Sequence, residues 1–373
     1  MVIGLGGIGS AVLAQCAARG LRVLGLERFS PAHARGASHG GSRIIRQAYF
    51  EGAAYVPLLR RTYALWKALE ERSGRTLFTR TGGLFAGTPD RAVVAGTLES
   101  ARVHGLDHEV LEPEALRRRY PQFRLRRGEI AVFEAAAGVL FPERCVLAHL
   151  EVALDDGAAA RFGTRASGWD VVGDGVVVRT AEDELHARRL VVAAGPWLGA
   201  LIPAFERIVR VERNVQFWFA PAASDDVGPA RLPIFAVERS EWEFMLYGFP
   251  DFGDGVKCAF HHSGNFQDPE LEHTVTESEV DSVRLALRSW LPSANGTLRG
   301  TAACMYALTP DDHFIIGPHA DSDHVILAGG FSGHGFKFCP IVGEIVADLL
   351  TQGGTSWDIA MFSPQRFVAS NAR

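Results

Sequence analysis

The stretch VIGLGGIGSAVLAQCAARGLRVLGLE, residues 2–27, decides the fold. Gly4, Gly6 and Gly9 form a G-x-G-x-x-G motif between a short apolar run and a segment whose apolar residues have helical spacing. A second apolar run follows and ends in Glu27. This order predicts a strand, a helix and a second strand. In such a unit the pyrophosphate of a dinucleotide lies at the helix N-terminus.

Each residue of the motif has its own physical role. Gly4 allows the tight turn, Gly6 lets the pyrophosphate approach the backbone, and Gly9 lets the helix pack closely on the sheet. Glu27 is placed to accept hydrogen bonds from ribose hydroxyls, which favours FAD or NAD. Only three residues precede Gly4, fewer than a central strand usually has, so we expect the natural chain to begin further upstream.

Composition limits the class of protein. The chain has 373 residues, a length that favours two domains, and its net charge of -5 comes from mixed acids and bases without a basic face. Its five cysteines are scattered and odd in number, which favours a reducing compartment, and no zinc-type spacing occurs. No apolar run is long enough to span a membrane. We therefore expect a cytoplasmic protein with no metal, nucleic-acid or membrane partner.

A second glycine-rich turn lies near the C-terminus. The segment HVILAGGFSGHGFKF predicts a strand at 325–327 and a turn at 329–335, and an apolar helical stripe begins at Ile341. Earlier, residues 184–202 predict a short strand that ends in Ala-Gly, which is typical of FAD-binding folds. The N-terminus of the second helix could stabilise negative charge on a flavin ring. Together these features favour FAD.

With these motifs, the sequence resembles the monomeric sarcosine oxidase and N-methyltryptophan oxidase family of D-amino-acid-oxidase-like FAD-dependent oxidoreductases. The resemblance covers nearly the whole chain. It rests on ordered blocks that include GLGGIG, SHGGSRIIRQAY, GVLFPERC, YGFPDFG, VKCAFH, ANGTLRGTAACMY, DDHFIIG and GGFSGHGFKF.

The expected fold is of the α/β (α+β) class, with a Rossmann-like FAD-binding domain interleaved with an antiparallel-sheet substrate domain. We expect the FAD-binding domain to comprise 1–80, 140–210 and 300–373. The substrate domain would comprise 81–139 and 211–299, where alternating apolar runs predict antiparallel strands.

The resemblance also implies how the cofactor is held. In this family the cysteine of the CMY block, here Cys304, carries FAD through a thioether to the 8α-methyl group of the ring. A thiolate is the form that can make such a bond. The other expected cofactor-binding residues are Gly4, Gly6, Gly7, Ile8, Gly9, Glu27, Arg28, Ser42, Arg43, Gly333, Gly335 and Lys337.

The substrate implied by the resemblance is a secondary amine that bears a carboxylate. Arg46 and Lys337 match the pair that binds this carboxylate, because arginine grips two oxygens as a fork and lysine adds a point charge. Tyr247 matches a substrate-binding position. The catalytic residues implied are listed together: Lys257, Arg43, His261 and Tyr306. Lys257 and Arg43 match positions beside the flavin, and a fixed cation at Lys257 would stabilise the charge formed on O2.

The expected reaction is oxidation of the amine to an imine, with O2 reduced to hydrogen peroxide by a monomeric enzyme. One alternative is an amine dehydrogenase or complex subunit that passes electrons to a partner, and another is a flavin-binding protein without turnover. Ala236 stands where sarcosine oxidases have a bulkier residue, and Trp242 is added nearby. These differences put sarcosine itself in doubt, so the expected substrates extend to larger N-alkyl amino acids and to cyclic imino acids such as pipecolate and proline.

Overall fold

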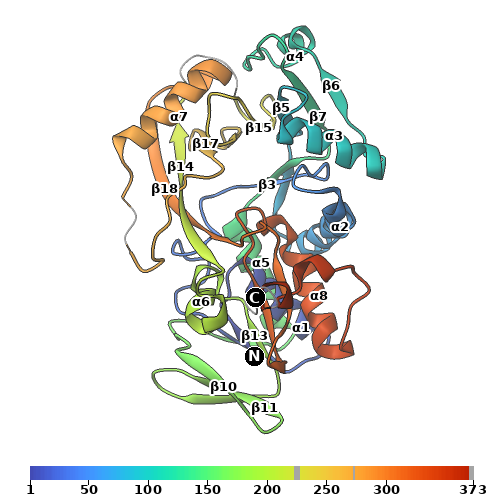
Figure 1. Ribbon diagram of the computed structural model, residues 1–373, viewed down its shortest axis with the longest axis vertical. Coiled ribbons are helices and arrows are strands. Elements are labelled where there is room, and N and C mark those ends of the chain that lie inside the picture. The colour runs from blue at the N-terminus through green and yellow to red at the C-terminus, as the bar shows by residue number, and fades with distance from the viewer. Residues whose placement is uncertain (222–226, 272–273, 369–373) are drawn as a thin grey trace.

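The computed structural model describes residues 1–221, 227–271 and 274–368. Figure 1 shows an elongated molecule, with an α/β region at one end and a large, mainly antiparallel sheet at the other. Within the described part of the chain, no helix is both long and apolar enough to cross a membrane. The mixed α/β class expected from the sequence is confirmed.

The first sheet is parallel except at one edge, where β19 runs antiparallel to β20. β1 lies in its middle and pairs with β13 and with β2, the strand that precedes Glu27. The predicted strand–helix–strand unit is therefore present. In sheet order the six strands are β19 (Ile315–His319), β20 (Ser322–Gly329), β13 (Leu190–Val192), β1 (Val2–Ile3), β2 (Leu24–Leu26) and β9 (Ala159–Arg161).

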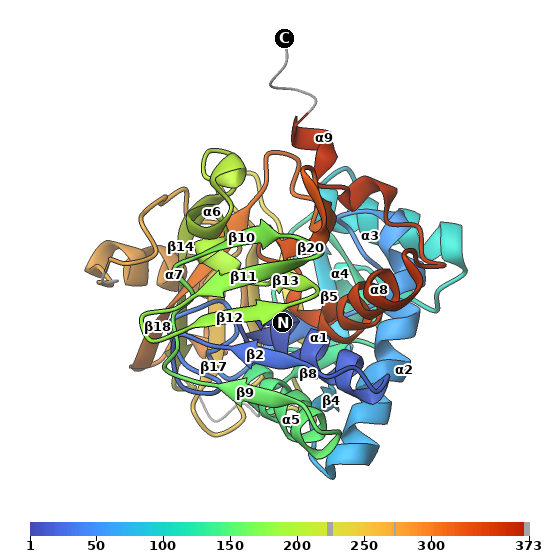
Figure 2. The same ribbon diagram turned by 90° about the horizontal axis from the view of Figure 1, so that it is seen from below.

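Side chains alternate between the two faces of this sheet, because successive residues of a strand point in opposite directions. Val2, Val191 and Ile326 pack with the helices, whereas Ile3 and Leu327 pack on the other face. That other face is covered by a three-stranded sheet and a short helix (Figure 2). These elements are β10 (Gly168–Val172), β11 (Gly175–Arg179), β12 (Glu184–Ala187) and α6 (Leu198–Leu201).

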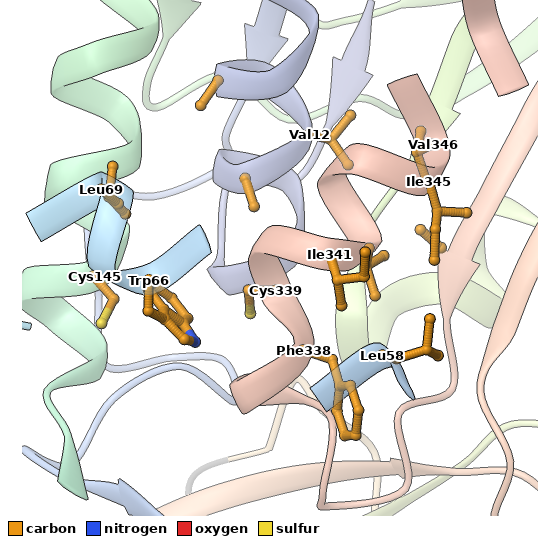
Figure 3. Packing of buried hydrophobic residues seen from close by; sticks show 14 of the residues in the cluster. Val12, Leu58, Trp66, Leu69, Cys145, Phe338, Cys339, Ile341, Ile345 and Val346 are labelled. Atoms are coloured by element: carbon orange, nitrogen blue, oxygen red, sulfur yellow. The ribbon is translucent and has the colours of Figure 1, made fainter. Parts of the chain in front are cut away.

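Four helices form the layer on the first face. Figure 3 shows α8 packed against α1, in a core to which Val12 of α1, Trp66 of α2, Cys145 of α5 and Ile341 of α8 contribute. The predicted stripe that begins at Ile341 is the buried face of α8. The four helices are α1 (Gly7–Ala18), α2 (Val56–Ser73), α5 (Pro142–Asp155) and α8 (Cys339–Gln352), and the C-terminal α9 covers Gln365–Val368.

The second large sheet has eight strands, antiparallel except where β15 meets β5. One face packs against α7 (Glu277–Trp290) and α4 (Pro113–Arg119), and α3 (Ala92–His104) packs on β5. In sheet order the strands are β18 (Leu298–Leu308), β14 (Arg210–Phe219), β17 (Val256–Phe260), β16 (Leu246–Phe249), β15 (Ile234–Val237), β5 (Gly83–Gly87), β7 (Ile130–Glu134) and β6 (Glu109–Leu111).

A small sheet lies between the two large ones in Figure 1. It consists of β3 (Arg43–Ile45), β8 (Gly138–Leu140) and β4 (Phe78–Arg80). The two-domain division remains a proposal. β18 pairs along its length with β14 of the eight-stranded sheet. A boundary after residue 308 therefore fits the hydrogen bonding better than the predicted boundary at 300.

Candidate functional site

The first of two adjoining cavities has a volume of about 280 Å³ and follows the N-terminal motif. Its wall includes most of the residues expected to bind the cofactor: Gly4, Gly6, Gly7, Ile8, Glu27, Arg28, Arg43, Gly333 and Gly335. Gly9 does not line it. A Cβ at Gly9 would lie 1.7 Å from the carbonyl oxygen of Gly4, so Gly9 serves the close helix–strand packing that its place in the motif predicts.

Glu27 reaches this cavity from the end of β2. Its carboxylate accepts hydrogen bonds from the Leu5 N–H at 2.8 Å and the Phe29 N–H at 3.0 Å. Burial opposes ionisation, but hydrogen bonds from His33 and these amides outweigh it and lower the pKa of Glu27. A charged carboxylate held in this way fits the ribose hydroxyls of an adenosine dinucleotide. Arg28, next to it, forms a two-pronged ion pair with Glu270.

The second glycine-rich turn closes the same cavity from the other side. Gly333 has a φ of +77°, and a Cβ there would lie 2.5 Å from the Tyr306 ring. The site therefore requires glycine both for the turn and for the close approach of a ring. Two helix N-termini, a buried carboxylate and this glycine wall together fit FAD.

The second cavity, of about 70 Å³, shares Arg43, Tyr306 and Gly333 with the first. The chain thus brings the cavity along the N-terminal glycine motif directly against a small chamber. Most of the residues expected to act on the substrate line this chamber: Arg43, Arg46, Tyr247, His261, Tyr306 and Lys337, with Ser42 beside them. Its remaining wall is largely apolar and includes Ile44, Phe50, Ala236, Met245 and Phe249.

Arg46 is one of two buried cations in the chamber and is 3% exposed. Its guanidinium lies over the rings of Tyr49 and Phe50, donates to the Ala48 carbonyl oxygen at 3.0 Å, and forms an ion pair with Glu51. Burial opposes ionisation of Glu51, but Arg46 and other nearby cations outweigh it and lower its pKa to about 2. In this structure Nη2 of Arg46 is therefore engaged by Glu51 and Nη1 by the Ala48 carbonyl oxygen.

Lys337 is the second cation and is 5% exposed. Its Nζ donates to the His334 carbonyl oxygen at 2.7 Å and to the Tyr49 hydroxyl at 3.4 Å. Burial lowers the pKa of Lys337 to about 7, while Glu51 opposes this shift. The charge of the chamber therefore changes near neutral pH.

Tyr247, His261 and Tyr306 meet at one side of the chamber. His261 and Tyr306 lie with ring centroids 5.6 Å apart, and the Tyr306 hydroxyl is 3.5 Å from His261 Nδ1. Burial, and then the neighbouring His262, lowers the pKa of His261 well below its ordinary value. A neutral imidazole beside two phenols offers hydrogen-bonding groups without adding to the positive charge of Arg43, Arg46 and Lys337.

Lys257 lies in β17, the third strand from one edge of the eight-stranded sheet, and is 2% exposed. It lines neither cavity. Its Nζ donates to the Gly40 carbonyl oxygen at 2.7 Å, and to the carbonyl oxygen and the hydroxyl of Ser42 at 3.0 Å each. Burial and Arg43 lower its pKa well below the ordinary value. Lys257 therefore lies behind the part of the chamber wall that Ser42 and Arg43 form, in contact with Ser42.

Cys304 of β18 lies directly behind the wall of the first cavity. The residue is 1% exposed, and its Sγ is 3.4 Å from Nη2 of Arg43 and 3.6 Å from the Ala37 carbonyl oxygen. Ala37, Arg43 and the next two residues of β18, Met305 and Tyr306, all line the first cavity.

Several chamber residues were not predicted from the sequence, and Trp242 was placed wrongly. His334 stands in a quoted block, but its hydrogen-bond partner Tyr49 lies 285 positions away. Glu51 lies two residues after another quoted block and pairs with Arg46, a contact that no pattern in the sequence indicated. Trp242 packs against Phe260 and Arg239, on the side of the sheet that faces α7, and does not line the chamber. The chamber wall near Ala236 is therefore not narrowed by this tryptophan.

Comparison with protein families gives one extended match. Residues 1–349 match the model of the FAD dependent oxidoreductase family. The expected family assignment and FAD dependence agree with this match.

Comparison with individual proteins gives the same picture. The chain is 44% identical to a monomeric sarcosine oxidase from Streptomyces avermitilis, covering 100% of this chain and 98% of that relative. It is 35% identical to the N-methyl-L-tryptophan oxidase of Salmonella dublin, with 98% of each covered. Among solved structures, NikD, an amino acid oxidase of nikkomycin biosynthesis, superposes with a TM-score of 0.84 at 26% identity, covering 97% of this chain and 96% of that one.

Proposed function

Because the chain belongs to the monomeric sarcosine oxidase and N-methyltryptophan oxidase family of FAD-dependent oxidoreductases, we propose that it oxidises a secondary-amine amino acid to an imine, with O2 as the electron acceptor. One observation carries the proposal. Two buried cations, Arg46 and Lys337, line a small chamber that opens on the dinucleotide cavity.

The chamber divides into a charged part and an apolar part. Arg46 and Lys337 would bind the substrate carboxylate, and the ion pair between Arg46 and Glu51 must open for a two-pronged grip to form. The apolar wall around Met245 and Phe249 would take the N-alkyl group and the side chain. Desolvation inside the chamber strengthens the attraction between carboxylate and cations, which fixes the orientation of the substrate.

The cofactor residues fit FAD in the same arrangement. Gly4, Gly6 and Gly7 would approach the pyrophosphate at the N-terminus of α1, and Glu27 would accept from the ribose. When bound, FAD supplies a two-electron acceptor for the C–H bond next to the amine nitrogen. The neutral His261, with Tyr247 and Tyr306, would accept and donate hydrogen bonds around that amine.

We propose that Cys304 is the covalent attachment point for FAD. Its thiol is packed beside the guanidinium of Arg43, and the next two residues of β18, Met305 and Tyr306, line the first cavity. The expected result is that yellow colour stays with acid-precipitated protein, and that Cys304→Ala releases it. The measurement is the intact mass, which should exceed the polypeptide mass by one FAD only when Cys304 is present. Cys258→Ala, at another buried cysteine, is the matched control. Free release of flavin from the unaltered protein would contradict the tether.

The substrate proposed is an N-methyl amino acid with a side chain, or a cyclic imino acid. The support is Ala236, a small residue that is 1% exposed and lies in the chamber wall beside Tyr247. We also propose that the protein is a monomer. For its location, we propose the reducing cytoplasm. The five buried cysteines, none of which forms a disulfide, support this location.

Measurements of oxygen consumption and peroxide release test both the electron acceptor and the substrate class. The panel contains sarcosine, larger N-methyl amino acids, proline and pipecolate, and the matching amines without a carboxylate. Consumption of O2 with the carboxylates only is expected. If amino acids reduce the flavin but O2 is not consumed, the protein is a dehydrogenase that passes electrons to a partner.

A further inference from the structure

We propose that Tyr49 and His334 are positioning residues for Lys337, which hold its ammonium group in the chamber and set the pH at which that group loses its charge. The inference rests on the function proposed above, in which Lys337 binds the substrate carboxylate. Its basis is a chain of hydrogen bonds whose donors and acceptors can be assigned one by one.

The direction of the chain is fixed at His334. Its Nε2 lies 2.9 Å from the carbonyl oxygen of Asp312, and a carbonyl oxygen can only accept, so Nε2 carries the hydrogen. In a neutral imidazole, Nδ1 is then an acceptor. The Tyr49 hydroxyl lies 2.6 Å from Nδ1 and therefore donates to it.

The consequence reaches Lys337. Since the single hydroxyl proton of Tyr49 is directed at His334, the oxygen of Tyr49 can only accept from Lys337, whose Nζ is 3.4 Å away. The backbone of His334 supplies a second acceptor at 2.7 Å. Two acceptors that face one buried amine favour its protonated form.

The hydroxyl is held rigidly in this place. The Tyr49 ring is fully buried and packs edge-on against Phe338, with centroids 5.4 Å apart, and against Tyr55 at 5.2 Å. His334 packs on Phe314 at 4.9 Å. Neither partner of the hydrogen bond is therefore free to move away from Lys337.

Because of its electrostatic surroundings, the contact between Lys337 and the Tyr49 hydroxyl affects the charge of Lys337 near neutral pH. Burial lowers the pKa of Lys337 to about 7, so a change in one acceptor alters its charge under ordinary assay conditions. Several other charged or titratable groups influence Lys337 or are influenced by it: Glu51, Arg46, Cys339, His334 and His261.

The test measures acetate binding to the flavin-loaded protein by the change in flavin absorbance, from about pH 6 to pH 9. In the unaltered protein, affinity should fall as the pH rises through the pKa of Lys337, because the cation is lost. Tyr49→Phe removes only the acceptor oxygen and keeps the ring. In this variant the decrease in acetate affinity should occur at a pH lower by about 0.5 to 1 pH unit, because the ammonium has lost a stabilising contact.

Tyr55→Phe is the matched control. It removes a hydroxyl from the adjoining ring, but this hydroxyl bonds His313 Nδ1 at 2.9 Å and does not touch Lys337. If the pH profiles of Tyr49→Phe and Tyr55→Phe coincide, the inference is overturned. If the unaltered protein binds no acetate at any pH, the proposed carboxylate site itself fails, which is a separate outcome.

His334→Gln keeps the inference testable if Tyr49→Phe yields little protein. It removes the acceptor that orients the Tyr49 hydroxyl, so a smaller shift in the same direction is expected. The double variant should shift no further than Tyr49→Phe alone, because both changes act through the same oxygen. An unshifted profile in His334→Gln, or fully additive shifts, would contradict the assigned chain of hydrogen bonds.

Discussion

Exchange of Lys257 for methionine is expected to slow reoxidation of the reduced flavin by O2 by on the order of 10²-fold to 10³-fold. The physical reason is the loss of a fixed cation that would stabilise negative charge as it forms on oxygen. The Nζ of Lys257 is held by three oxygens of Gly40 and Ser42, next to the wall that both cavities share at Arg43. Negative charge nearby would favour its protonated form, against the effect of burial.

The measurement is stopped-flow mixing of the reduced protein with O2, and separately of the oxidised protein with substrate. The chain has three lysines, and Lys67, with a side chain that is 78% exposed, provides the matched control Lys67→Met. Only the oxygen reaction should slow in Lys257→Met. Ser42→Ala removes one contact of Lys257 and keeps its charge. If Lys257→Met slows both half-reactions equally, its role is to hold the loop at Ser42 and not to activate O2.

Replacement of Arg46 by methionine is expected to lower kcat/KM for a carboxylate-bearing substrate by on the order of 10²-fold to 10³-fold. The guanidinium is 3% exposed, so its charge interacts with an anion in a desolvated chamber. Arg46→Lys should recover only part of the loss, because lysine lacks the planar fork. Steady-state kinetics with an N-methyl amino acid and with the corresponding amine without a carboxylate measure the effect, which should be confined to the former.

A double variant separates two causes of that loss. Arg46→Met leaves the buried Glu51 without its ion-pair partner, which is costly in itself. Arg46→Met with Glu51→Gln removes both charges and keeps the shape of the chamber. If this double variant regains the activity of the unaltered protein, Arg46 serves only to neutralise Glu51, and its proposed role in binding the carboxylate is wrong.

Local patterns in the sequence predicted the parts of the fold that depend on local chemistry. The glycine spacing predicted the first turn and α1, and the apolar stripe predicted α8. Val256 and Cys258 of β17 pack in the core that faces α7, so Lys257 between them lies on the opposite face, behind the chamber wall at Ser42.

What the sequence could not supply is pairing across long separations. Tyr49 and His334 are 285 positions apart in the sequence, yet the Tyr49 hydroxyl lies 2.6 Å from Nδ1 of His334. They meet because α8 and the segment after β3 pack on the same core. The full pairing of β18 with β14 is also non-local. The resemblance supplied Arg46 and Lys337 as residues, but only the fold shows that Glu51 competes for the same arginine.

The most direct test of the central claim is anaerobic mixing of the purified protein with an N-methyl amino acid while the flavin absorbance is recorded. We expect the yellow absorbance to be lost with substrates that carry both a secondary amine and a carboxylate, and to persist with the same amines lacking the carboxylate. Persistence of the yellow absorbance with every N-methyl and cyclic amino acid would contradict the proposed activity. Equal bleaching without a carboxylate would contradict the roles of Arg46 and Lys337.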